Sequence, residues 1–329
     1  MNKSSIEWCD FTWNPVSGCS KVSGGCKNCY AEGVANRFWG DRKFTDVICH
    51  EDRLDQPLRR KKGARIFVNS MSDLFHEDVP FEFIDKVMAV VALCPQHTFI
   101  VLTKRPERMA EYFNGKFTKE LLNCRKAEIA GHVVKKAAAL GHDVTKIDWD
   151  IFYKWPLPNL WLLTSVEDQP TANRRIPKFL DVPAVVHGVS YEPALGAVDF
   201  TNIVYPKFKP THPHDPVISY DVLRGHMKGP DDVGLPKLDW IIAGGESGPG
   251  ARPSHPDFFR QVRDQCIEAG VPFFFKQWGE WGPGCSCGKS KNCEMTPMGQ
   301  YALFRCGKKA AGRLLDGQEW NQFPEVTSE

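Results

Sequence analysis

The sequence predicts an α/β protein built around a parallel (β/α) barrel. Short β-rich runs alternate with helical stretches along the chain, a pattern that favours a parallel sheet covered by helices. The β-rich runs are almost entirely apolar, as expected for strands buried on both faces. No internal repeat with a period of roughly 20 to 50 residues is present, which argues against a solenoid or a propeller.

Seven runs rich in Val, Ile, Leu and Phe are predicted to be the strands, because such residues favour a pleated, half-buried backbone. In chain order they are Phe11–Trp13, Ile66–Asn69, Phe99–Thr103, Leu160–Thr164, Ala184–Val189, Trp240–Ala243 and Phe273–Phe275. Two segments show helical periodicity. In Phe81–Cys94 the apolar positions recur at i, i+3, i+4 and i+7, and in Pro256–Ala269 one stripe carries Phe259, Val262 and Cys266.

Composition excludes several classes of protein. With 42% hydrophobic and 25% charged residues among 329, the chain is an ordinary globular one and not a disordered one. Its formal charge of +2 predicts no strong global attraction to nucleic acid. The longest apolar run, Val87 to Cys94, is far shorter than the roughly 18 residues of a membrane span, and the first residues lack the apolar core of a secretory signal. We therefore expect a cytoplasmic protein without a membrane segment.

The barrel is expected to cover residues 1–283, with insertions at about 106–158 and 202–236. The first insertion is expected to be helical, and the second, rich in proline, to be an irregular loop. Residues 284–329 are expected to form a cysteine-rich extension.

Polar side chains follow six of the predicted strands. In a parallel barrel all carboxyl ends of the strands lie on one rim, where active sites are built. The alternative is that polar residues merely begin the loops. The residues in question are Ser70, Asp73, Thr103, Lys104, Arg105, Ser165, Glu167, Ser190, Glu192, Gly244, Gly245, Glu246, Lys276 and Gln277.

Cysteines give the most specific signal. Cys19, Cys26 and Cys29 form a C-x6-C-x2-C array in a glycine-containing loop directly after the first main strand, and three thiolates in one loop indicate a metal. Adding Cys9 gives a closed four-thiolate zinc site, whereas three thiolates alone suit a [4Fe–4S] cluster with one open iron. A chance cluster of thiols without any metal is the remaining alternative. A second group near the end, a candidate site for zinc or an auxiliary cluster, comprises Cys285, Cys287, Cys293 and Cys306.

At these residues the chain resembles a known family. The blocks WNPVSGCSKVSGGCKNCYAE, VNSMSDLFH, LTKRPERM, SYEPALG, GGESGPGARP and FFFKQWGEW, spread over nearly the whole chain, resemble the phage-associated three-cysteine-motif family of radical S-adenosylmethionine (SAM)-like proteins, which is distantly similar to spore photoproduct lyase. The usual radical SAM spacing is C-x3-C-x2-C, whereas the first gap here has six residues.

The resemblance implies a partial, TIM-barrel-like fold and a radical SAM enzyme. In such enzymes three cysteines bind a [4Fe–4S] cluster and SAM chelates the fourth iron. An electron from a donor such as flavodoxin or ferredoxin then cleaves SAM to methionine and a 5′-deoxyadenosyl radical.

A bound SAM needs acceptors for its ammonium and ribose hydroxyls and a cation for its carboxylate. Asp73, Ser165 and Glu167 are predicted acceptors, and Lys104 or Arg105 the cation. Further cofactor or ribose contacts are assigned to Glu192 and Glu246, and substrate contacts to Arg252 and Lys276, with salt bridges inside the barrel as the alternative.

The substrate class stays open at this point. Basic clusters such as Arg59–Lys62 favour DNA or RNA, because local patches are enough to hold phosphates. A radical SAM enzyme acting on a peptide or small molecule is a second hypothesis. A zinc-stabilised, non-catalytic phage protein that binds nucleic acid or a partner is a third.

Overall fold

The computed structural model describes most of the chain, in two compact units. The first unit comprises the described residues within 1–20, 34–163 and 181–186, and the second those within 21–33, 164–180 and 187–329. The described ranges are 1–114, 127, 129–135, 138–139, 156–204, 219–227, 234–284 and 294–325.

The main sheet has eight strands in the order β1-β2-β5-β6-β7-β8-β12-β13, and every predicted strand is confirmed as one of them. Within the first unit β2 pairs in parallel with β5, and β5 with β6; within the second, β8 pairs in parallel with β12, and β12 with β13. The two-residue strand β1 pairs with β2 in the antiparallel direction. The bounds are β1 Asn2–Lys3, β2 Phe11–Trp13, β5 Arg65–Val68, β6 Thr98–Thr103, β7 Leu160–Val166, β8 Val186–Tyr191, β12 Trp240–Gly244 and β13 Phe273–Gln277.

The predicted burial of these strands is also confirmed. Every residue of β7, β8 and β12 is buried, as in a parallel sheet covered on both faces. The chain is therefore a mixed α/β protein with a mostly parallel sheet, and the strand order is open, with β1 and β13 at its edges.

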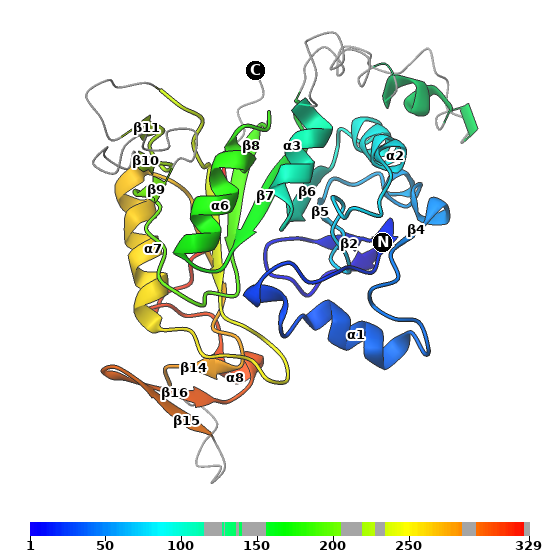
Figure 1. Ribbon diagram of the computed structural model, residues 1–329. Helices are drawn as coiled ribbons and strands as arrows, with labels where there is room; N and C mark the ends of the chain where they lie inside the picture. Colours follow the sequence, from blue (N-terminus) through cyan, green and yellow to red (C-terminus); the bar gives the residue numbers. More distant parts are fainter. Residues whose placement is uncertain are drawn as a thin grey trace, which may run out of the picture. The chain divides into compact units, whose positions relative to one another are not determined.

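The first unit holds the helices α2 (Phe81–Ala92) and α3 (Pro106–Asn114), drawn in cyan and teal in Figure 1. Helix α2 confirms the periodicity at Phe81–Cys94, and its buried side chains include Ile84, Val87 and Val91. A small hairpin pairs β3 (Val16–Ser17) with β4 (Ile48–Cys49). Helix α3 begins the predicted insertion, most of which lies outside the described residues.

The second unit contains α6 (Gln169–Leu180) and α7 (Pro256–Ala269). Helix α7 has the bounds that its sequence predicts and packs against β12 and β13. Helix α1 (Tyr30–Phe38) follows the cysteines and continues from the second unit into the first.

Two further sheets belong to the second unit. Residues 202–236 were predicted to form an irregular loop, but they contain a three-stranded antiparallel sheet, because strands of two or three residues are too short to show a periodicity. Its strands are β9 (Ile203–Val204), β10 (Ser219–Asp221) and β11 (His226–Met227). The other sheet contains β14 (Trp281–Gly282), β15 (Met295–Met298) and β16 (Tyr301–Arg305), with α8 (Lys308–Ala311) against β14.

Across the described ranges, no helix is long and apolar enough to cross a membrane.

Acid should destabilise the first unit through a buried histidine. His97 is buried near the Pro57 carbonyl, and burial lowers its pKa below the usual value of 6.5. As the pH falls, His97 is therefore protonated in the unfolded chain at a higher pH than in the folded chain. This difference lowers the free energy of unfolding as the pH falls below about 6.5. We expect His97→Gln to show a smaller drop in melting temperature between about pH 7.5 and pH 5.5 than the natural chain. Equal drops would contradict this assignment.

Candidate functional site

Arg105, in the first unit, contacts the first cysteine of the loop that comprises residues 19–29, here called the cysteine loop. Its Nη1 lies 3.6 Å from Cys19 Sγ and 3.2 Å from Asp73 Oδ2, and the guanidinium is buried. Burial opposes the charge of Arg105, but the opposite charges of Asp73 and Cys19 outweigh it and raise the pKa of Arg105. A permanent cation therefore faces the Cys19 sulfur, which favours a thiolate there.

Asp73 holds this cation in place. Its Oδ1 accepts from Phe75 N–H and from the Thr103 hydroxyl, at 3.0 and 2.7 Å. Its Oδ2 accepts from Lys104 N–H at 3.0 Å as well as from Arg105. The contact of Lys104 with Asp73 is made by its backbone, and both carboxylate oxygens of Asp73 are engaged within the first unit.

Ser20 is held by two donors. Arg105 Nη2 donates to its Oγ at 2.8 Å and to its carbonyl at 3.2 Å, and His76 Nε2 lies 2.8 Å from the same Oγ. His76 Nδ1 accepts from Asp78 N–H, so the ring proton is on Nε2 and points at Ser20. Burial, and then Arg105, lowers the pKa of His76, which keeps the ring neutral. Ser20 is thus an acceptor that fixes the loop and not an activated nucleophile.

Four hydrogen bonds hold the rest of the cysteine loop within the second unit. Ser23 Oγ donates to Glu167 Oε1 at 2.9 Å. Asn28 Nδ2 donates to Glu246 Oε2 at 3.0 Å and to the Gly250 carbonyl at 2.7 Å. Arg252 Nη2 donates to the Gly24 carbonyl at 3.0 Å. The residues on both sides of Cys26 are therefore held by side chains from distant parts of the sequence.

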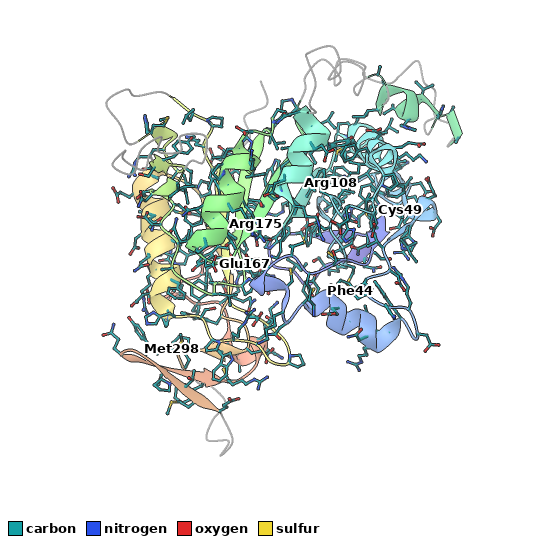
Figure 2. The ribbon with its side chains drawn as sticks, in the orientation of Figure 1. Phe44, Cys49, Arg108, Glu167, Arg175 and Met298 are labelled. Carbon is teal, nitrogen blue, oxygen red and sulfur yellow. The ribbon has the colours of Figure 1, made fainter. Side chains whose placement is uncertain are left out.

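Glu167 belongs to a fully buried ion pair with Arg175, and the two are labelled side by side in Figure 2. Arg175 Nη1 lies 2.9 Å from Glu167 Oε2 and 2.8 Å from the Ser165 carbonyl, and each side chain is 1% exposed. A Cβ at Gly25 would clash with the Glu167 carboxylate, so only glycine allows the cysteine loop to approach this closely.

Glu246 and Arg252 form the second carboxylate–cation pair. Arg252 donates through Nε, Nη2 and its backbone N–H to the two Glu246 oxygens, at 2.9, 2.5 and 2.8 Å. Burial raises the pKa of Glu246, but hydrogen bonds from Arg252 and Asn28 outweigh it and leave the pKa below its usual value. The hydrogen bond to Glu246 in turn raises the pKa of Arg252. The pair is ionised at neutral pH.

A third pair joins β13 to the end of β8. Lys276 Nζ lies 2.8 and 3.0 Å from the two Glu192 oxygens, and Gln277 Nε2 donates to Glu192 Oε1 at 3.2 Å. The two residues predicted to face a substrate, Arg252 and Lys276, are thus bound to two of the predicted cofactor ligands, Glu246 and Glu192. Their cofactor and substrate roles stay predictions.

Four residues that hold the cysteine loop or its charged partners were not predicted from the sequence: Ser23, Asn28, His76 and Arg175. Ser23 and Asn28 are polar residues in a loop, and such residues occur in most loops. Arg175 is on a helix, where an arginine side chain ordinarily faces solvent. Nothing local therefore marked these three residues. A local signal existed only for His76, which lies three residues after Asp73 in the strand-end segment.

The cysteines of the described part are present as thiols and not as disulfides. Cys19, Cys26 and Cys29 are partly exposed, whereas Cys9 is 6% exposed and its thiol donates to Ser4 Oγ and the Ile6 carbonyl. In the ranges that the structure describes, no three His, Cys, Asp or Glu side chains are placed as a ready metal site. Of the second cysteine group only Cys306 is described; Cys285, Cys287 and Cys293 lie outside the described residues.

These observations define an α/β protein with a mostly parallel sheet, whose cysteine loop is held by charged residues that follow the strands. The chain belongs to a protein family of unknown function, DUF5131, whose model matches residues 3–324. Comparison with curated proteins and with solved structures found no match.

Glu246→Gln should loosen the cysteine loop. The neutral amide cannot hold Arg252 as an ion pair, and the contacts of Asn28 and Gly24 depend on the same pair. A lost charged hydrogen bond of about 1.4 kcal/mol corresponds to a roughly tenfold change in opening. We expect iodoacetamide to alkylate Cys26 and Cys29 of the metal-free chain about tenfold faster. Glu192→Gln, which disturbs the contacts with Lys276 and Gln277 and none of those described above for the cysteine loop, is the matched control. Equal rates in the two variants would contradict the role of Glu246.

Proposed function

We propose that this protein is a radical SAM-type enzyme that holds a [4Fe–4S] cluster through Cys19, Cys26 and Cys29. The observation that carries the proposal is the cysteine loop itself: three partly exposed thiols within eleven residues, held by charged side chains. The open, mostly parallel strand order suits the partial barrel of this enzyme class.

The donor set fits such a cluster. Thiolates are the ligands of iron–sulfur clusters, and the Arg105 guanidinium at Cys19 stabilises a thiolate. Cys9 is left out of the ligand set, because its buried thiol is engaged by Ser4 and Ile6. Three ligands leave one iron open for SAM, as the proposal requires.

A bound cluster with SAM supplies reductive cleavage of SAM to a 5′-deoxyadenosyl radical. The chain's own residues bind and orient. Arg105, positioned by Asp73, contacts Cys19. The Glu246–Arg252 pair holds Asn28 and the Gly24 carbonyl, on the two sides of Cys26. The proposed contacts to SAM come from Ser165, Glu167 and Lys104. Arg175 already orients the Glu167 carboxylate for this contact.

A nucleic acid is the proposed substrate. The segment Arg59–Lys62 supports it, since Lys61 and Lys62 are exposed and the Arg59 side chain reaches solvent beside Asp55. Peptide and small-molecule substrates are the alternatives to be tested in the same assay.

Anaerobic reconstitution with iron and sulfide tests the proposal. A brown protein that contains iron and sulfide, and that forms 5′-deoxyadenosine from SAM with a reductant, is the expected result. Colourless protein with stoichiometric zinc would overturn the proposal in favour of a zinc-stabilised binding protein. Oligonucleotides, peptides and small molecules are then compared as agents that accelerate 5′-deoxyadenosine formation.

A further inference from the structure

Helix α1 turns its large apolar side chains outward. Tyr30, Val34 and Phe38 are 51%, 39% and 69% exposed, whereas Ala31 and Ala35 are buried. Residues four apart share one face of a helix, so the three exposed side chains form one stripe, here called the α1 stripe. An amphipathic surface helix ordinarily turns such residues toward the core. An exposed apolar stripe with a polar border indicates a surface that another molecule covers.

The sequence around the α1 stripe is basic. The Arg37 guanidinium lies 5.2 Å from the centroid of the Phe38 ring, so a positive charge adjoins the stripe itself. Lys21 is neutralised by an ion pair with Glu32 of α1, at 2.8 Å. The other exposed charged residues up to position 43 are one acidic residue, Asp41, and three basic ones, Lys27, Arg37 and Lys43. A partner for this surface should therefore be acidic, because charge complementarity speeds encounter and suppresses other partners.

The α1 stripe begins beside the cysteine loop. Tyr30 is the first residue of α1 and directly follows Cys29 in the sequence. A protein that covers Tyr30 and Phe38 consequently stands next to the loop that carries the thiols. This position suits a partner that exchanges electrons with whatever the thiols hold.

We propose that the α1 stripe is the docking surface of an acidic one-electron carrier protein, such as a flavodoxin. The inference rests on the proposed function, since the carrier's electron is passed to a cluster at the cysteine loop. The reduced carrier loses one electron and the cluster gains one, with no bond broken and no group transferred.

The size and charge of the α1 stripe favour this occupant over a second copy of the chain. Electron-transfer encounters bury small areas, below about 1,200 Å², whereas permanent dimers bury roughly 2,000 Å² or more. Three side chains on one short helix suit the smaller class. A symmetric dimer through this face would also bring each basic border against its own copy, which costs energy.

Two variants of the full chain test the α1 stripe. Phe38→Ala removes its most exposed side chain, and the double variant Arg37→Glu/Lys43→Glu, outside the cysteine loop, reverses its charge. The matched controls are Ile267→Ala, an apolar residue on α7 that is 54% exposed, and Lys178→Glu, an exposed lysine on α6. Two measurements are made at low salt: the affinity for oxidised flavodoxin, and the stopped-flow rate at which reduced flavodoxin reduces the cluster.

We expect both stripe variants to weaken flavodoxin binding and slow reduction by about tenfold, the effect of losing one central interface residue. The charge reversal should also remove the loss of rate that added salt causes in the natural chain. Reduction by dithionite, which needs no docking, should be unchanged in every variant.

Flavodoxin binding and reduction that match the natural chain in both variants would overturn the docking surface. So would a dimer that Phe38→Ala dissociates, because the α1 stripe would then belong to a second copy. If the reconstituted chain contains no iron, the proposed function is overturned instead. The affinity for flavodoxin does not depend on that result and tests the docking surface separately.

Discussion

Cys26→Ala should leave the reconstituted protein without iron or sulfide, and Cys19→Ala and Cys29→Ala should do the same. A [4Fe–4S] cluster bound by three thiolates loses a third of its protein ligands with each change, and the fourth position belongs to SAM in the proposed mechanism. Iron and sulfide are measured per chain after anaerobic reconstitution, and the visible absorption of the cluster gives a second readout.

Cys9→Ala is the matched control for these losses. Its thiol is buried against Ser4 and Ile6, so its removal should leave the iron content unchanged. Iron loss in Cys9→Ala as complete as in Cys26→Ala would instead support four thiolate ligands, and the mechanism with an open iron would fail.

Arg175→Met should destabilise the protein by about 3–5 kcal/mol, because it leaves the Glu167 carboxylate buried without its cation. Urea denaturation followed by tryptophan fluorescence measures the loss in free energy of unfolding. The double variant Glu167→Gln/Arg175→Met should recover most of it. Two nitrogens of Arg175, Nε and Nη2, are buried without a hydrogen-bond partner among the described residues, so methionine removes a desolvation cost as well.

The exposed pair Arg59–Asp55 provides the comparison. The distance from Arg59 Nη2 to Asp55 Oδ2, 2.8 Å, is similar to the 2.9 Å of the Arg175–Glu167 pair, but the Arg59 side chain is 71% exposed. Arg59→Met should therefore cost only about 0.3–0.5 kcal/mol. If Arg175→Met costs no more than Arg59→Met, the buried pair does not stabilise the second unit as described.

Local residue patterns were enough to place most of the main sheet and two of its helices. Helix α7 illustrates why: Pro256 fits the first helical position, where its missing N–H is not needed, and Gly270 ends the helix in the left-handed conformation with φ at 68°. The apolar residues Leu160–Leu163 that begin β7 likewise indicate burial on both faces. Such signals act within a few residues, so a sequence displays them directly.

The sequence by itself also determined the cysteine loop, because three thiols in C-x6-C-x2-C spacing need no tertiary contact to be noticed. Which charged residues hold the loop was decided by the tertiary structure alone. Asn28 and Glu246 are 218 residues apart, and Ser23 and Glu167 are 144 apart. The burial of Arg175 depends in the same way on its pairing with Glu167. The free energy of a buried charge depends on the oppositely charged partner beside it. That partner is distant in the sequence, so the local hydropathy of the chain does not identify it.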